Sequence, residues 1–155
     1  MHMGQIRHQI VLLAVVTFVV VSMIISVIPA PEPQEHGGAG ENIEGEVTRI
    51  VDGDTLYIDD VKIRLALVDA PEYGETGYDE AKDFAADICP EGSQATADQD
   101  DWQLEDEYGR MIAVVYCGGK NLNYELLKSG HAVILTQYCA VSEFGDETWA
   151  VEYGC

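Results

Sequence analysis

The stretch VKIRLALVDAPE, residues 61–72, combines a strand pattern with several charged side chains. From Val61 to Val68, aliphatic residues occupy every second position. Because successive side chains of a strand point to opposite faces, this alternation predicts one strand with a buried aliphatic face. Arg64 then points away from that face, and Pro71 ends the strand.

The segments on either side predict a small barrel. Asp and Gly at 52–54 and the pair Asp59-Asp60 favour tight turns. The predicted strands cover 46–50, 56–58 and 111–117, one more is required within 94–104, a short pairing segment is expected at 132–135, and the predicted helices cover 79–88 and 121–127, the second capped by Gly130. Strands outnumber helices and turn signals recur about every 8–12 residues, which favours an α+β, mainly β, barrel with added helices. We expect the remaining C-terminal segment to be irregular.

The chain is strongly acidic. Its 155 residues contain 28 Asp and Glu against 8 Lys and Arg, which gives a formal net charge of -20. Nearly all of these residues follow residue 40, so the charge belongs to the predicted folded domain, 45–155. Such a field repels polyanions within a Debye length, about 10 Å at 0.1 M salt. Composition alone therefore argues against nucleic-acid binding at low salt, and less so in a saline habitat.

The N-terminal region predicts export. Ile10 to Ile28 is an apolar run that would reach roughly 28 Å as a helix, close to the hydrocarbon thickness of a bilayer. We therefore interpret 1–28 as a signal peptide or a transmembrane anchor, and we prefer the uncleaved anchor. Residues 29–44, with three prolines and three glycines, predict a flexible linker. Arg7 precedes the apolar run, which places the domain outside the cytoplasm, at the cell surface or secreted.

Four cysteines lie in the predicted exported domain: Cys89, Cys117, Cys139 and Cys155. An even number in an oxidising compartment favours two disulfides, with three possible pairings. The pairing that we prefer joins Cys89 to Cys117 and Cys139 to Cys155, because the second bond would close the short tail. No C-x-x-C pair occurs, which disfavours a zinc site.

Three short segments concentrate acids and arginines: 51–55, 64–72 and 106–110. Asp54 and Asp69 supply the hard oxygen ligands that Ca²⁺ prefers. Glu72 is close enough in sequence to Asp69 to orient or deprotonate a water. Arg64 and Arg110 could clamp phosphoryl oxygens as negative charge develops. Together these groups predict a phosphodiesterase.

The order of the three motifs, D-G-D-T at 52–55, R-L-x-L-V-D-x-P-E at 64–72 and D-x-Y-G-R at 106–110, resembles the staphylococcal nuclease (thermonuclease-like) family. The resemblance covers Gly45 to about Gln137 and implies a five-stranded OB-fold barrel. It also implies a calcium-dependent endonuclease that hydrolyses single-stranded or frayed DNA and RNA with little sequence preference. We expect a monomer whose only membrane association is through the N-terminal segment.

The resemblance also implies individual roles. Asp54, Asp69 and the backbone carbonyl of Ala70 would bind calcium, and Glu72 would act on the attacking water. The resemblance further implies that Arg64 and Arg110 engage the phosphate and that Tyr108 lies beside a phosphate. Two departures stand out: Ala70 replaces a frequent threonine, and Glu107 replaces a frequent lysine with a charge that repels phosphate.

Other interpretations compete with this one. A non-catalytic OB-type module could bind nucleic acid or protein at the cell surface, although all five principal site residues are retained. An anchored structural protein could instead collect cations on its acidic surface. Asp106 is expected to fix the turn before Tyr108, and His131 is interpreted as a structural histidine.

Overall fold

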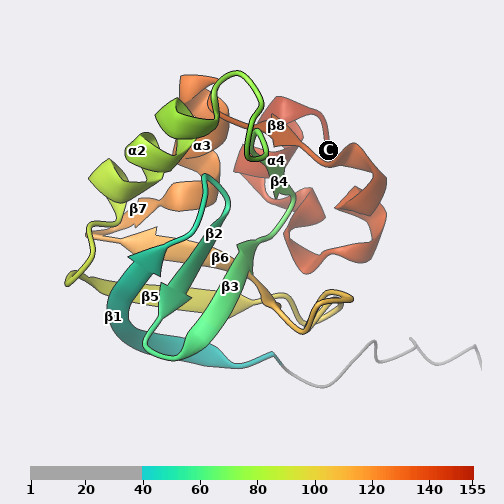
Figure 1. Cartoon of the computed structure of the whole chain (residues 1–155). Helices are drawn as coiled ribbons and strands as arrows, with labels where there is room; N and C mark the ends of the chain where they lie inside the picture. Colours follow the sequence, from blue (N-terminus) through green and yellow to red (C-terminus); the bar gives the residue numbers. More distant parts are fainter. Residues whose placement is uncertain (1–39) are drawn as a thin grey trace, which may run out of the picture. The chain divides into compact units, whose positions relative to one another are not determined.

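The computed structural model describes residues 40–155, so the predicted signal or anchor segment and most of the linker lie outside the described residues. Within this range no helix is long and apolar enough to cross a membrane. Figure 1 shows a curved sheet with helices at one end. The predicted α+β class, mainly β, is confirmed.

Five strands close the barrel, in the order β3-β2-β1-β5-β6, with a parallel pairing of β3 and β6 completing the circle. The bounds are β1 Asn42–Ile50, β2 Thr55–Ile58, β3 Val61–Leu65, β5 Gln94–Gln99 and β6 Met111–Cys117, and β7 Lys120–Asn121 extends β6. β1 pairs with both β2 and β5, and its register shifts between Val47 and Arg49. Such an irregularity bends a strand and increases its twist, which helps the sheet close. The OB-fold prediction is confirmed.

The core fills the barrel with aliphatic side chains from alternate strand positions. Val47, Ile58, Ile63 and Leu65 are all at most 1% exposed. Each buried side chain of this size contributes on the order of 2 kcal/mol relative to exposure. As the alternation in β3 predicted, Ile63 and Leu65 face inward and are buried, whereas Arg64 does not face inward.

The predicted strand 61–68 is wrong in one respect, because it breaks at Ala66 and Leu67. β3 ends at Leu65, and a short β4, Val68–Asp69, pairs with β8, Val133–Ile134, in a separate two-stranded sheet. Leu67 has a φ of 61°, which is unusual for a branched residue. Buried Asn123 donates to the carbonyl of Ala66 at 2.9 Å and stabilises the turn. The chain thereby reverses directly beside Arg64.

Helices cover one end of the barrel (Figure 1). α2, Tyr78–Ile88, buries Ala81 and Ala85, and α3, Leu122–Ser129, is capped by the side chain of Asn121 and ends at Gly130, whose φ is 77°. Both helices agree with the sequence pattern to within two residues. α2 lies against the segment that carries the D-G-D-T sequence, because Tyr78 donates to the carbonyl of Val51 and Gly53 packs closely on Ala81.

Two terminal boundaries differ from the prediction. β1 begins at Asn42, three residues before Gly45, because 42–46 pair with β5. The C-terminal segment is not irregular: it contains two 3-10 helices, η2 Thr136–Val141 and η3 Glu143–Asp146, and α4 Thr148–Tyr153. Buried Phe144 packs this tail against the domain. Both predicted disulfides form, Cys89 with Cys117 and Cys139 with Cys155.

Candidate functional site

Asp54 lies buried at the end of the D-G-D-T turn, with 3% of its surface exposed. The carboxylate of Asp52 accepts the backbone N–H of Asp54 at 3.2 Å and holds the turn. A Cβ on Gly53 would lie 2.7 Å from the Cβ of Ala70 and 2.8 Å from that of Ala81. Only glycine permits this close approach, so the sequence D-G-D brings Asp54 against the segment that starts at Asp69.

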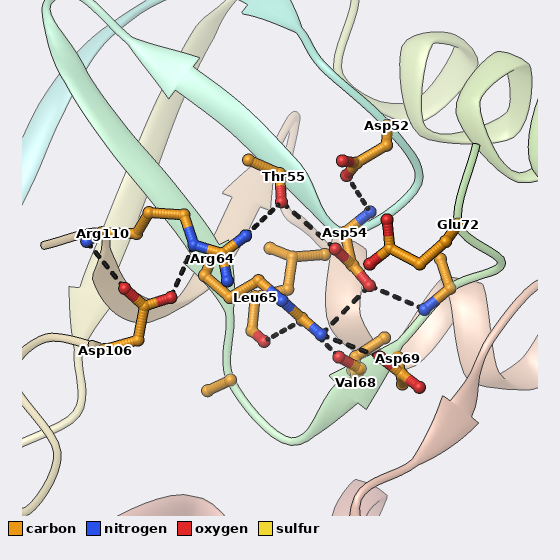
Figure 2. A network of polar contacts seen from close by, with 12 residues as sticks. Asp52, Asp54, Thr55, Arg64, Leu65, Val68, Asp69, Glu72, Asp106 and Arg110 are labelled. Atoms are coloured by element: carbon orange, nitrogen blue, oxygen red, sulfur yellow. Dashed lines mark hydrogen bonds and ion pairs between the residues drawn. The ribbon is translucent and has the colours of Figure 1, made fainter. Parts of the chain in front are cut away.

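Arg64 joins the two predicted metal ligands. Its Nη2 lies 3.2 Å from Asp54 Oδ2 and 3.0 Å from Asp69 Oδ1. Its Nη1 donates to the carbonyls of Leu65, at 3.0 Å, and Val68. Figure 2 shows the guanidinium between the two carboxylates. The break after β3 therefore serves the site, because the carbonyls of Leu65 and Val68, on either side of the break, orient this arginine.

The contacts of Asp54 do not fully offset the cost of burying its negative charge. Burial raises its pKa to about 6, although Arg64 and the backbone N–H of Ala70, which donates to Oδ2 at 2.7 Å, both act to lower it. Asp52 and Asp69 add a further upward contribution through repulsion. An additional cation at this position would relieve both effects.

Arg110 is fixed by a second carboxylate. Its Nε donates to Asp106 Oδ2 at 2.5 Å, and its Nη1 donates to the hydroxyl of Thr55 at 3.3 Å. Asp106 Oδ1 also accepts the backbone N–H groups of Tyr108 and Arg110. Burial alone would raise the pKa of Asp106, but the hydrogen bonds from Arg110 and Tyr108 lower it below its usual value. The predicted turn-fixing role of Asp106 is confirmed, and the same residue orients Arg110.

The two arginines open onto one cleft of about 490 Å³. The cleft is also lined by Tyr108, Glu107 and Tyr138. Tyr108 is 75% exposed, and the guanidinium of Arg110 lies 5.4 Å from the centre of its ring. The guanidinium of Arg110 and the exposed ring of Tyr108 therefore lie close together on the same wall of the cleft.

The remaining predicted residues lie on β4 and in the loop that follows it. Glu72 is exposed on the loop after β4, and its carboxylate points toward Asp54 (Figure 2). Asp69 and Ala70 line a smaller cleft of about 240 Å³ together with His131. The ring of His131 lies 4.8 Å from that of Phe84, which agrees with a structural histidine.

The sequence of this region matches a known family. Residues 62–152 match the profile of the staphylococcal nuclease homologues. The chain belongs to this family. An uncharacterized endonuclease of Escherichia coli O157:H7 is 36% identical to this nuclease homologue over 106 residues, which cover 63% of the chain and 64% of the relative.

Two further relatives carry nuclease names. Micrococcal nuclease of Shigella flexneri is 32% identical over 107 residues, 61% of this chain and 59% of the relative. Endonuclease YhcR of Bacillus subtilis strain 168 is 34% identical over 121 residues, 67% of this chain and 9% of the relative. The nuclease homologue therefore spans less than two thirds of the length of each of these relatives.

The donor set of the nuclease homologue fits a hard cation. Among residues 40–155 no three His, Cys, Asp or Glu side chains are already grouped as metal ligands. Asp54 and Asp69 nevertheless present carboxylate oxygens to one shared guanidinium, and the pKa of Asp54 is raised by burial. Carboxylates with carbonyl and water oxygens are the ligands that calcium prefers, so the residues present suit that ion.

The sequence did not reveal two residues that hold the site together. The hydroxyl of Thr55 donates to Asp54 Oδ1 at 3.2 Å and accepts from Arg110, so it links two motifs that are far apart in sequence. Asn123 accepts the N–H of Val115 and donates to the carbonyls of Ala66 and Ala113. A polar residue on the apolar face of a predicted helix was the only available signal for Asn123.

Proposed function

We propose that this chain is a calcium-dependent phosphodiesterase, an endonuclease that hydrolyses DNA, RNA or both with little sequence preference. One observation carries the proposal: a continuous polar network runs from Arg110 through Thr55 and Asp54 to Arg64 and Asp69. Figure 2 shows this network. Two arginines and two carboxylates in one network are the parts that phosphoryl chemistry requires.

The arginines would bind the scissile phosphate. Arg64 lies on β3 and Arg110 directly precedes β6, and both line the same cleft, so one phosphate group could meet both. Each guanidinium is charged at every working pH and can donate two parallel hydrogen bonds to oxygen. Asp106 and the carbonyls beside Arg64 restrict the two side chains, which reduces the ordering cost when substrate binds. Tyr108 lies at the rim, where its ring and hydroxyl could contact an adjacent nucleotide.

Glu72 would orient and deprotonate the attacking water. It is exposed, so it can reach a solvent molecule, and it points toward the carboxylate of Asp54. A calcium ion held by Asp54, Asp69 and the carbonyl of Ala70 would supply a Lewis acid that polarises the phosphoryl oxygen. The nuclease names of the relatives support this assignment of substrate.

The predicted location is the outer side of a membrane, either anchored by 1–28 or secreted. The two disulfides support it, because such bonds persist in oxidising compartments. We further propose that the domain acts as a monomer.

The test is digestion of heat-denatured DNA and of RNA by the purified protein, with calcium and then with chelator, over a salt series. We expect calcium-dependent cutting that Glu72→Gln removes and Glu80→Gln, an equal change on exposed α2, leaves intact. Absence of cutting at every salt concentration, with retained binding of the strand, would favour the alternative, a non-catalytic OB-type binding module. The observation behind that alternative is that Arg64 already donates to three oxygen atoms of the protein itself and forms an ion pair with a fourth, on Asp54.

A further inference from the structure

Half of the basic residues of the chain belong to one outer face of the barrel, which β1, β2 and β3 form with the adjoining start of β6. The chain has 8 Lys and Arg, and four of them lie on this face: Arg49, Lys62, Arg64 and Arg110. The candidate site uses Arg64 and Arg110. Arg49 and Lys62 have no part in that site, so their position beside it needs a separate explanation.

The strand register brings these side chains into one row. Arg49 on β1 lies opposite Tyr57 on β2, and Tyr57 lies opposite Lys62 on β3. β3 also pairs in parallel with β6, in a register that sets Lys62 beside Arg110, directly before the first paired residues. Figure 1 shows β1, β2 and β3 side by side. Neighbouring strands lie about 4.8 Å apart, so this row, named here the β1–β3 basic row, extends about 14 Å from Arg110 in the cleft to Arg49.

The two additional cations are not neutralised by the protein. Among residues 40–155 no ion pair includes Arg49 or Lys62, although acids far outnumber bases in the chain. Arg49 is exposed, and its Cζ lies 4.3 Å from the centre of the half-buried ring of Tyr57. A ring under a guanidinium holds it at the surface, while the N–H donors at its edge stay available to an acceptor. The row therefore presents positive charge to solvent.

A strand of nucleic acid is the occupant that this row fits. A single strand carries phosphates at regular intervals, and proteins that bind it combine a line of cations with aromatic side chains. The row also continues directly from Arg110, which we propose as a phosphate ligand. Because the chain has a formal net charge of -20, an anionic strand is repelled elsewhere and is held only where cations gather.

We propose that the β1–β3 basic row binds the substrate strand beyond the scissile phosphate, with Arg49 and Lys62 on phosphate groups and Tyr57 as the residue that positions Arg49. This inference rests on the proposed function, because it extends the site of Arg64 and Arg110, but it concerns strand binding and not the hydrolytic step. The row lengthens the strand that the domain holds, so affinity rises with the length of the substrate. Short and long substrates therefore respond differently to changes in the row.

The test is equilibrium binding of fluorescein-labelled oligothymidylates, one of two nucleotides and one of twelve, to the purified protein in chelator over a salt series. The wild type binds the longer ligand at least tenfold more tightly. Arg49→Ala and Lys62→Ala each weaken binding of the longer ligand about fivefold at about 0.1 M salt, and each makes the slope of log K against log salt shallower by about 0.7. Binding of the shorter ligand, which fills only the cleft, is unchanged.

Two comparisons separate the row from general charge and from packing. Lys120→Ala, the same charge change on exposed β7, leaves binding of both ligands unchanged. Tyr57→Ala weakens binding of the longer ligand as Arg49→Ala does, whereas Tyr57→Phe, which keeps the ring beneath the guanidinium, binds as the wild type does.

Cutting of denatured DNA, measured in parallel, distinguishes this inference from the proposed function. If the wild type does not cut but the losses of binding occur, the row stands and the nuclease function fails. If the wild type cuts and Lys62→Ala binds the longer ligand as tightly as Lys120→Ala does, the row is refuted and the nuclease function stands. The row is also refuted if the wild type binds the longer ligand no more tightly than the shorter one.

Discussion

The candidate active site and a second group of acids both concentrate carboxylates, but only the site has arginines among them. The second group, the β5–η3 acidic cluster, lies where β5 meets the C-terminal tail and consists of Asp98, Asp100, Asp101, Glu143 and Glu147. At the site Arg64 lies against Asp54 and Asp69, and Arg110 pairs with Asp106. At the cluster, among residues 40–155, no Lys or Arg forms an ion pair, and the carboxylates of Asp100 and Glu143 accept backbone N–H groups. Hydrogen bonds from Arg110 and Tyr108 lower the pKa of Asp106, whereas burial raises the pKa of Asp98, of Glu143 and, despite Arg64, of Asp54. The position of a few arginines, and not the total charge, decides where a polyanion could bind.

This comparison resolves the objection raised by composition. A formal charge of -20 predicts repulsion of nucleic acid at long range. Only 8 basic residues are present, yet both Arg64 and Arg110 line the same cleft. A short-range clamp of this kind survives screening, whereas the long-range repulsion is lost within about 10 Å at 0.1 M salt. High salt should therefore favour the proposed activity.

The strongest way to break the comparison is Arg64→Ala, which turns the site into a second unpaired cluster. We expect a loss of kcat on denatured DNA of about 10³-fold, because a phosphate ligand is removed. We also expect a loss of unfolding free energy on the order of 3 kcal/mol, because buried Asp54 is left without its ion pair. Steady-state cleavage and urea unfolding measure the two effects. Lys120→Ala, which removes an exposed lysine on β7, is the control, and unchanged cleavage in Arg64→Ala would refute the assignment.

A pH series in chelator sharpens the comparison. The pKa of Asp54 is raised from 3.8 to about 6, so the stability that it contributes is fully present below 3.8 and is lost as pH rises through about 6. Asp98 and Glu143 act in the same direction. Asp106 acts in the opposite direction, since its lowered pKa makes its contribution present at neutral pH and lost on acidification.

We therefore expect the unfolding free energy to rise by about 1–3 kcal/mol between neutral pH and about pH 5, and to fall again in stronger acid. Urea unfolding at each pH measures it. Asp54→Asn should flatten the rise near pH 6 and leave the acid fall unchanged. A monotonic increase of stability up to neutral pH would show that the carboxylates of the site are better compensated than the contacts indicate.

A smaller effect is expected from Thr55→Val, which keeps the shape of a buried side chain and removes the hydroxyl that links Asp54 to Arg110. We expect kcat/KM to fall about tenfold, near the 1.4 kcal/mol that one misplaced hydrogen bond costs. Thr55→Ser should restore it. Equal loss in both variants would assign Thr55 to packing alone.

The sequence predicted those features that depend on local pattern or on motif order. The alternation in β3 and the helix predicted over 79–88, which the structure starts at Tyr78, needed only nearby residues. The preferred Cys pairing rested on the closure of the short tail. The family match and the network in Figure 2 agree with the residues that the motifs singled out. Their catalytic and metal-binding roles remain predictions.

What the sequence did not predict depends on contacts between distant segments. The break at Ala66 requires Asn123, which lies 57 residues away. The ordered tail requires Phe144 to pack in a second cluster with Leu67 and Val114. Asp100 gave no signal of its own, because a single acid in an acidic chain is expected at the surface. Two of its backbone N–H partners, Trp102 and Gln103, are local, but the third, Glu143, is 43 residues away and is brought close only by the fold.

The smallest expected effect concerns Glu107, one of three acids that line the cleft of the candidate site. Glu107→Lys replaces an exposed charge that repels phosphate with one that attracts it. We expect KM to fall by a factor that corresponds to about 0.5–1 kcal/mol of binding free energy, with little change in kcat. Because this contribution is screened, the variant should outperform the wild type most at low salt and lose its advantage as salt increases. Cleavage kinetics over a salt series measure it, with Glu80→Lys on α2 as the control for net charge. An advantage of equal size at every salt concentration, or in both variants, would mean that Glu107 does not face the bound strand.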